Sequence, residues 1–166
     1  MTPRSLVVGV AAYAASAYIL DGILRPAWVA RRAREAARRR GKPLLNVGAG
    51  TAETSFRAAL LGPTAWGDVN CDIAATSAHC ADASVCWCDA TRLFYPDKHF
   101  GAVIATHVLE HLDDPDAALA EWSRVADEVF VVVPAWWAPH TWLHPGHKWY
   151  LAAARGGGYR GFRLWP

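Results

Sequence analysis

The chain has 166 residues, which is enough for one domain with a buried core and a short additional segment. Its formal net charge of +2 excludes the strongly basic surface typical of nucleic-acid binding, so we expect no nucleic-acid partner. Hydrophobic residues make up 53% of the chain and include nine tryptophans. This excess indicates contact with a membrane or with a large partner surface.

An uncharged run over residues 6–20 lies near the start of the chain and continues, past Asp21, to residue 24. About 20 helical residues, each rising about 1.5 Å, cross a bilayer core of about 30 Å. A cleaved signal peptide and a buried core helix are the alternatives. Arginines follow the run directly, and positively charged flanks stay in the cytoplasm. We therefore predict a single-pass transmembrane helix over residues 1–25, with the main domain in the cytoplasm.

Residues 26–42 alternate alanine with arginine and form a strongly helical sequence. A charged helix in solvent is one interpretation. Because the segment follows a predicted membrane span, we favour a basic juxtamembrane helix on anionic lipid headgroups, with Trp28 at the interface. Gly41 and Pro43 end this helix, so the third predicted unit is a domain over residues 43–166.

A glycine turn follows the first apolar run of that domain. Residues 44–47 are typical of a buried parallel strand, and Gly48 and Gly50 come directly after it. Glycine lets the backbone turn sharply and lets a ligand approach the main chain. With a helix predicted over residues 53–61, the pattern indicates a nucleotide-type site at the carboxyl end of a strand.

Strands and helices alternate along the rest of the domain, which indicates an α/β fold with a mostly parallel sheet and flanking helices. Asp72, about 20 positions past the glycines, is suited to binding ribose hydroxyls. Further strands are predicted over residues 65–71, 84–88, 101–105 and 129–133, and helices over residues 74–83 and 116–125.

In this order the motifs resemble the class I S-adenosylmethionine-dependent methyltransferases, especially the small-molecule group, over residues 44–134. Residues 46–51 resemble the glycine-rich first motif, Asp72 the ribose-binding acid and Asp89 the acidic position near adenine. Residues 100–112 resemble the fourth strand and its loop. The resemblance implies a Rossmann-like fold and S-adenosylmethionine as cofactor. It implies cofactor binding by Asn46, Gly48, Gly50, Asp72, Asp89 and His107.

The sequence departs from the family pattern at several positions. Asn46 replaces an acidic residue, Ala52 a third glycine and Gly101 an aspartate. About thirty residues follow Pro134, which is too few for the family's full ending. We therefore predict a Rossmann-like sheet truncated at its C-terminal end, in which cofactor binding or catalysis is either retained or lost.

Residues 107–111, His-Val-Leu-Glu-His, also match an inverted zinc-protease motif. We disfavour that interpretation because the motif leaves a predicted strand and enters a loop rather than a helix. The four cysteines contain no Cys-x-x-Cys pair, and their spacing does not suit the common structural zinc sites. We expect free thiols in a reducing compartment and no metal site.

The tail over residues 136–150 is dense in aromatic and histidine residues. Methyltransferases of the group it resembles place such residues over the methyl acceptor, so His147 and Tyr150 are the candidate catalytic residues, for substrate contact or proton transfer. A loop packed on the sheet, or an aromatic surface for a partner or the membrane, is the alternative.

Together these patterns predict a membrane-anchored, S-adenosylmethionine-dependent methyltransferase-like protein that acts on a small molecule or lipid. The alternative is a catalytically inactive accessory subunit of a large membrane complex, for example a photosynthetic or respiratory one. Membrane lipids and membrane-protein subunits are the expected partners, because small residues in the span and aromatic residues in the tail suit close packing.

Overall fold

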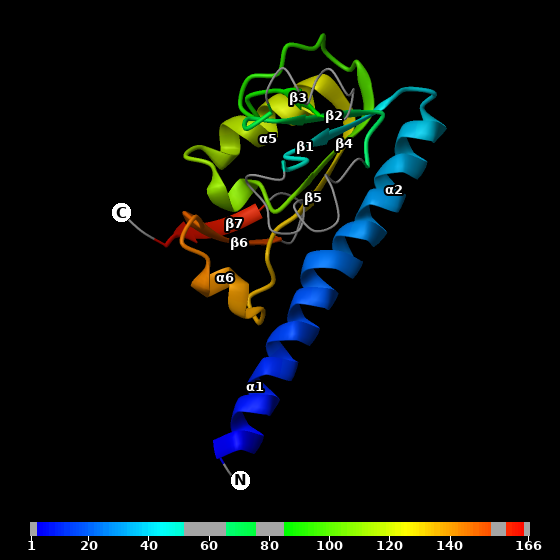
Figure 1. Ribbon diagram of the computed structural model, residues 1–166. Helices are drawn as coiled ribbons and strands as arrows, with labels where there is room; N and C mark the ends of the chain where they lie inside the picture. Colours follow the sequence, from blue (N-terminus) through cyan, green and yellow to red (C-terminus); the bar gives the residue numbers. More distant parts are fainter. Residues whose placement is uncertain (1–2, 52–65, 76–84, 154–158, 165–166) are drawn as a thin grey trace.

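The computed structural model describes residues 3–51, 66–75, 85–153 and 159–164. A long amino-terminal helix runs beside a domain built on a parallel sheet (Figure 1). The helices predicted over residues 53–61 and 74–83, and the departure at Ala52, lie almost entirely outside the described residues.

The long helix consists of three segments that follow one another without a break: α1 (Pro3–Ala17), a π-helical segment (Tyr18–Leu24) and α2 (Arg25–Arg39). Its amino-terminal part projects away from the domain (Figure 1). Within residues 5–39 an 18-residue window has a mean hydropathy of 1.7, and 11% of it is buried. The helix is therefore long and apolar enough to cross a membrane, as the sequence predicts, although a signal sequence also has these properties.

Helix α2 packs against the sheet through its alanines. Ala30, Ala33, Ala36 and Ala37 are buried on one face of the helix and pack in one cluster with β-strand residues such as Ile104. Alanine allows this close approach because its side chain is one methyl group. The predicted helix is thus present, but its alanine face covers the sheet. Contact of the remaining, arginine-bearing face with lipid headgroups stays a prediction.

The sheet has five strands, all parallel, in the order β3-β2-β1-β4-β5. The strands are β1 (Leu44–Val47), β2 (Val69–Asp72), β3 (Cys86–Trp87), β4 (Phe100–Thr106) and β5 (Ala126–Val132). The face opposite α2 is covered by α5 (Pro115–Val125), whose Trp122 and Val125 pack in the main core with Val103. The predicted α/β fold is confirmed, with strand ends that differ from the predictions by a few residues.

The tail forms its own small unit after β5. A short helix, α6 (Pro139–Leu143), leads to the antiparallel hairpin β6 (Trp149–Ala153) and β7 (Tyr159–Arg163). Among the described residues this hairpin is a separate two-stranded sheet, and the parallel sheet ends at β5. The predicted truncation at the C-terminal end stays a prediction.

The absence of a side chain at Gly101 is explained by the approach of α2. A Cβ atom at this position on β4 would lie 2.8 Å from the Ala37 Cα and 3.0 Å from the Ala37 carbonyl oxygen. Both are backbone atoms, so a side chain would force the helix away from the sheet. The aspartate common at this position in similar sequences does not fit here.

Gly101→Ala is expected to lower the free energy of unfolding by about 1–3 kcal/mol, because it overpacks the α2–β4 contact. Denaturant unfolding in mild detergent, followed by tryptophan fluorescence, measures the change. Gly9→Ala is the matched control, since a Cβ at Gly9 meets nothing within 4 Å. Equal stability of the Gly101 variant and the parent chain would contradict this account of the packing.

Candidate cofactor and acceptor site

The glycine turn lies at the carboxyl end of β1, the middle strand of the sheet. Gly48 and Gly50 have φ angles of +73° and +74°, a region that side chains other than glycine's rarely adopt. The Gly48 and Ala49 amides donate to the Cys71 carbonyl at 2.8 and 3.1 Å. A Cβ at Gly48 would also lie 2.2 Å from the Val108 Cγ2. Both backbone conformation and space therefore require glycine at position 48.

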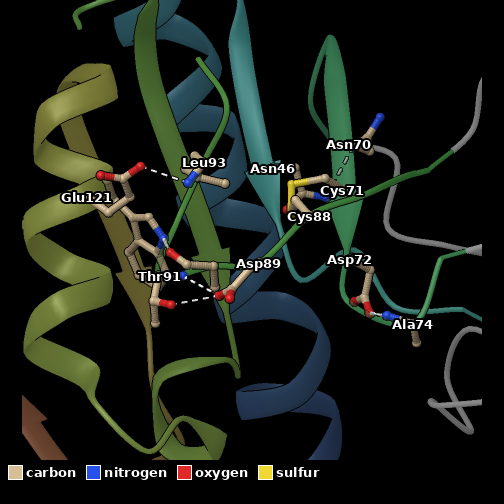
Figure 2. The surroundings of a disulfide bond; sticks show 12 residues. Asn46, Asn70, Cys71, Asp72, Ala74, Cys88, Asp89, Thr91, Leu93 and Glu121 are labelled. Carbon is tan, nitrogen blue, oxygen red and sulfur yellow. Dashed lines mark hydrogen bonds between the residues drawn. A yellow bond between two sulfur atoms is a disulfide. The ribbon is translucent and has the colours of Figure 1, made fainter. Parts of the chain in front are cut away.

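Asp72 ends the neighbouring strand β2 and bonds to this turn. Its Oδ2 accepts from the Gly50 amide at 2.8 Å, and its Oδ1 accepts from the Ala74 amide at 2.9 Å; Figure 2 shows the carboxylate and Ala74 at the end of the strand. Each carboxylate oxygen has a second acceptor position. Asp72 can therefore hold the turn and still accept from a ligand hydroxyl.

Asp89 follows β3, the edge strand next to β2. Its Oδ1 accepts from the Thr91 amide at 2.8 Å and from the Thr91 hydroxyl at 2.7 Å (Figure 2). The two bonds from Thr91 favour the charged carboxylate, so they hold the pKa of Asp89 below its usual value. Asp89 is therefore an ionised acceptor at neutral pH.

A disulfide joins Cys71 to Cys88 directly before these two carboxylates (Figure 2). The prediction that all four cysteines are free thiols is therefore wrong. The two chain positions are 17 residues apart in sequence, but the pairing of β2 with β3 brings their Cα atoms to 5.5 Å. That separation suits a disulfide, and spacing in the sequence did not reveal it. Cys86 is exposed and lies outside the bond.

Asn46 lies inside the sheet, with none of its surface exposed. Its side-chain amide donates to the Asn70 Oδ1 at 3.2 Å, and Asn70 in turn accepts from the Gly67 amide at 2.9 Å. These contacts connect β1 to β2. A direct contact between Asn46 and a cofactor stays a prediction.

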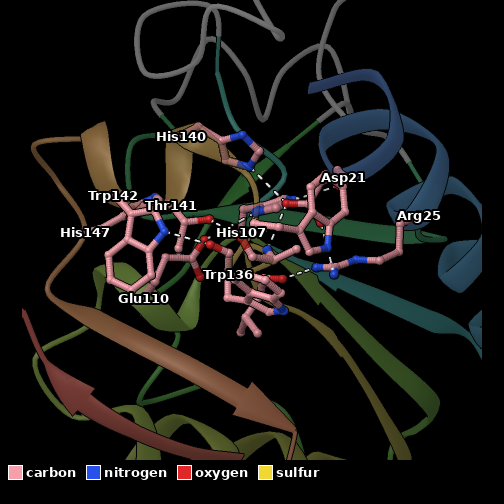
Figure 3. Close-up of polar contacts among 12 residues, drawn as sticks. Asp21, Arg25, His107, Glu110, Trp136, His140, Thr141, Trp142 and His147 are labelled. Atoms are coloured by element: carbon pink, nitrogen blue, oxygen red, sulfur yellow. Dashed lines mark hydrogen bonds and ion pairs between the residues drawn. The ribbon is translucent and has the colours of Figure 1, made fainter. Parts of the chain in front are cut away.

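His107 follows β4 and turns toward the long helix (Figure 3). Its φ of +56° is rare for a residue with a side chain. The ring Nε2 lies 3.4 Å from the Asp21 carbonyl oxygen, and Nδ1 lies 3.4 Å from the Glu110 Oε1. Its predicted role in cofactor binding is not tested, but the structure shows that the helix and Glu110 occupy its ring nitrogens.

The two residues predicted to act on the acceptor lie in different surroundings. His147 is 4% exposed, and its ring lies beside the rings of His111 and His144. Tyr150 instead stacks on Trp142, with ring centroids 5.1 Å apart. On its other side Tyr150 contacts Phe162, and both Trp142 and Phe162 are about half exposed. The joint catalytic role of His147 and Tyr150 stays a prediction.

The zinc-protease interpretation lacks the helix that it requires. Of residues 107–111, the last three form a single 3-10 turn, and no α-helix includes His107. The ring of His107 faces His140, whereas the ring of His111 faces His144 and His147. The two histidines therefore do not share one helix face.

Two buried acids near the site were not predicted as functional residues. Asp21 and Glu110 are each 1% exposed. Asp21 had a visible signal, since it is the one charge within an apolar run of more than fifteen residues. For Glu110 the sequence signal was its position in the motif over residues 107–111. The tail packs on this loop, where the Lys148 amide donates to the Glu110 carbonyl at 2.7 Å, and so helps to bury the carboxylate.

The residues at the carboxyl ends of β1, β2 and β3 fit a nucleoside-containing cofactor. A tight glycine turn and two ionisable acceptors lie on three adjacent strands, and such a crevice is where α/β sheets bind ligands. Asp72 would accept from ribose hydroxyls, and Asp89 from an adenine amine.

Comparison with known proteins agrees with this geometry. Residues 45–128 match a family described as "Methyltransferase domain". Over 41 residues the chain is 49% identical to the ubiquinone/menaquinone biosynthesis C-methyltransferase UbiE of Cupriavidus necator. This match covers 25% of the chain and 17% of that relative, so the chain corresponds to only a small part of the relative's length.

One solved structure is also similar: a possible histamine N-methyltransferase, described as S-adenosylmethionine-dependent, from Thermotoga maritima. The identity is 19% and the TM-score 0.37. The similarity covers 66% of this chain and 54% of the other.

Loss of the disulfide is expected to destabilise the β2–β3 end of the sheet. Closing a loop of about 15 residues stabilises a fold by roughly 3 kcal/mol, so Cys88→Ser should lower the free energy of unfolding by an amount of that order. Cys86→Ser, on the neighbouring strand position but outside the bond, is the matched control. Denaturant unfolding without reductant measures both variants, and equal losses would contradict a stabilising disulfide.

Proposed function

This chain belongs to the class I S-adenosylmethionine-dependent methyltransferases, and we propose that it is a membrane-anchored member that methylates a small molecule or lipid. The observation that carries the proposal is the arrangement of Gly48, Asp72 and Asp89 at the ends of three adjacent parallel strands. The family implies S-adenosylmethionine as the cofactor, and these residues are the ones that would hold it.

When bound, S-adenosylmethionine supplies a methyl group on a positively charged sulfur, which a nucleophile can displace. The chain's own contribution is alignment and exclusion of water. The Gly50 amide and the Asp72 carboxylate fix the turn that receives the nucleoside. Loops after β4 and β5 would lie over the acceptor, since they leave the same edge of the sheet.

The exposed residues of the long helix support a membrane anchor. Leu6, Val7, Val8 and Val10 are each more than half exposed on α1. The 15 residues of α1 extend about 22 Å at about 1.5 Å per residue, which is shorter than a bilayer core of about 30 Å. A span of full thickness would therefore include part of the next segment. The domain contacts the helix on both segments, at Tyr13 and at Asp21.

Exposed aromatic residues of the tail lie at that contact and suit the headgroup layer. The Tyr13 hydroxyl on α1 donates to the Trp137 carbonyl, which places the start of α6 beside the helix, as in Figure 1. Trp136, Trp142 and Leu143 are all exposed there. Tryptophan is enriched at membrane interfaces, so this edge of the domain would rest on the bilayer.

A site held against a bilayer favours an acceptor that dissolves in it. The partial relative named above is a C-methyltransferase of ubiquinone and menaquinone biosynthesis, and the agreement with a lipid-soluble acceptor supports this substrate class. The nucleophile on such an acceptor is either a carbon or a heteroatom.

The second candidate is a non-catalytic accessory subunit of a large membrane complex. It is favoured by the stack of Trp142, Tyr150 and Phe162, which has exposed rings at both ends and suits a protein partner. In this alternative the small residues of the span and the aromatic tail contact neighbouring subunits, and the cofactor fold serves as a scaffold.

Calorimetry with S-adenosylhomocysteine is expected to show one site on the purified chain. Asp72→Asn should weaken binding about 10- to 100-fold, because a hydrogen bond to a charged acceptor contributes about 1.5–3 kcal/mol. Asp116→Asn, an exposed position on α5, is the control and should leave the affinity unchanged. No binding at millimolar ligand would contradict the enzyme proposal and favour the accessory subunit.

Proteolysis of sealed vesicles tests the membrane topology. In inside-out vesicles the domain over residues 44–166 is expected to be digested, because the arginines after the span keep it in the cytoplasm. Protection there, with digestion in right-side-out vesicles, would reverse the orientation. That outcome would place the Cys71–Cys88 disulfide in an oxidising compartment, where such bonds commonly persist.

A further inference from the structure

Three histidine rings from two separate loops meet beside the tail. His111 ends the 3-10 turn after β4, and His144 and His147 lie between α6 and β6. One ring nitrogen from each residue lies within 4.8 Å of one from each of the other two. The ring centroids are 4.6 to 5.2 Å apart. Neither the cofactor proposal nor the family motifs use this cluster as a unit.

Hydrogen bonds orient two of these rings for metal binding. The His111 Nδ1 lies 2.8 Å from the Gly146 carbonyl oxygen, and the His147 Nδ1 lies 2.9 Å from the Thr141 carbonyl oxygen. A carbonyl only accepts, so Nδ1 carries the proton in both rings and Nε2 keeps its lone pair. Donation of the second ring nitrogen to a carbonyl is what metal-ligating histidines usually show.

The third ring has its lone pair on the other nitrogen. The His144 Nδ1 accepts from the Gly146 amide at 3.1 Å, so it carries no proton. The ring of His144 is exposed, so it can rotate away from this bond to present a nitrogen to an ion. A Cβ at Gly146 would lie 3.1 Å from the His144 Cε1 and 3.3 Å from the His111 Nδ1, so glycine is what permits the rings to approach.

A buried carboxylate lies near the cluster. Burial lowers the pKa of both His144 and His147. The buried Glu110 carboxylate acts electrostatically on both rings. Within the described part of the chain neither Glu110 oxygen accepts a hydrogen bond, and its nearest charge partner is the His107 Nδ1 at 3.4 Å. A cation in the histidine cluster would compensate this buried carboxylate.

We propose that His111, His144 and His147 bind a divalent transition-metal ion of the zinc type. Zinc takes histidine nitrogens at about 2.0–2.1 Å in tetrahedral geometry, which puts ligand atoms about 3.3 Å apart. The cluster therefore contracts by up to about 1.5 Å when it binds the ion. Three protein ligands leave a fourth position open, on the exposed side given by His144. The sequence led us to expect no metal site. The spacing did not reveal this one because its ligands come from loops 33 residues apart.

Such an ion would fasten the tail to the loop after β4. Several contacts already join the two segments near the cluster: the bond from the Lys148 amide to the Glu110 carbonyl, the Lys148–Asp113 ion pair, and the hydrogen bonds His111–Gly146 and Trp149–Leu112. A zinc ion bound to His111 in the loop and to His144 and His147 in the tail would join the two segments directly. The expected effect is protection of the tail, whether or not the chain binds S-adenosylmethionine.

Zinc titration of the full chain in mild detergent tests the proposal. The protein carries a tag without histidines, is first treated with chelator, and contains no S-adenosylmethionine. Competition with a chromogenic chelator is expected to show one ion per chain. His144→Ala and His147→Ala should each weaken binding by more than about tenfold. His144 is exposed, so its variant keeps the fold intact.

His99→Ala is the matched control, since His99 is exposed, stacks on Tyr95 and meets Phe100 edge-on, away from the three histidines. It should bind zinc like the parent chain. Cobalt substitution gives a second readout, because a tetrahedral site produces strong visible absorption that the His144 variant should lose. Absence of a stoichiometric ion, or equal affinities of the His144, His147 and His99 variants, would overturn the proposal.

Discussion

The position of the long helix depends on one buried carboxylate, that of Asp21. It accepts from the Ala135 amide at 2.9 Å and pairs with His140 at 3.0 Å, both in the tail, and with Arg25 at 3.0 Å on its own helix (Figure 3). A carboxylate that is 1% exposed is costly unless such partners surround it, and loss of a partner typically costs about 3–5 kcal/mol. Arg25 also donates to the Val133 carbonyl, so helix, β5 and tail are fixed at a single point.

Once the helix is fixed there, its continuation has little freedom. The π-helical segment around Asp21 shifts the helical register, and α2 then presents its alanines to the sheet. The close approach requires glycine at position 101 and leaves the opposite face of the sheet to α5. The long helix and the strands that end at the candidate cofactor site are thus parts of one packed arrangement.

The tail connects these two regions. From α6 it contacts the long helix through His140 and Trp137, and through the next loop it contacts the segment after β4. Its histidines lie in two places: His140 lies 3.0 Å from the Asp21 carboxylate of the helix, whereas His144 and His147 lie beside His111. A short extension that lies outside the parallel sheet therefore joins the long helix to the loop after β4.

The sequence by itself determined the features that depend on local order along the chain. Apolar runs, glycines and acids in a fixed succession predicted the parallel strands, the turn at Gly48 and Gly50 and the carboxylates Asp72 and Asp89, because each element places the next in a βαβ fold. Only the tertiary structure decided which distant residues meet. Cys71 bonds Cys88 because β2 lies beside β3 in the sheet, Asp21 is buried because the tail covers it, and His111 reaches His144 and His147 through a loop contact. None of these contacts has a period or a spacing, since each arises from packing between elements far apart in sequence.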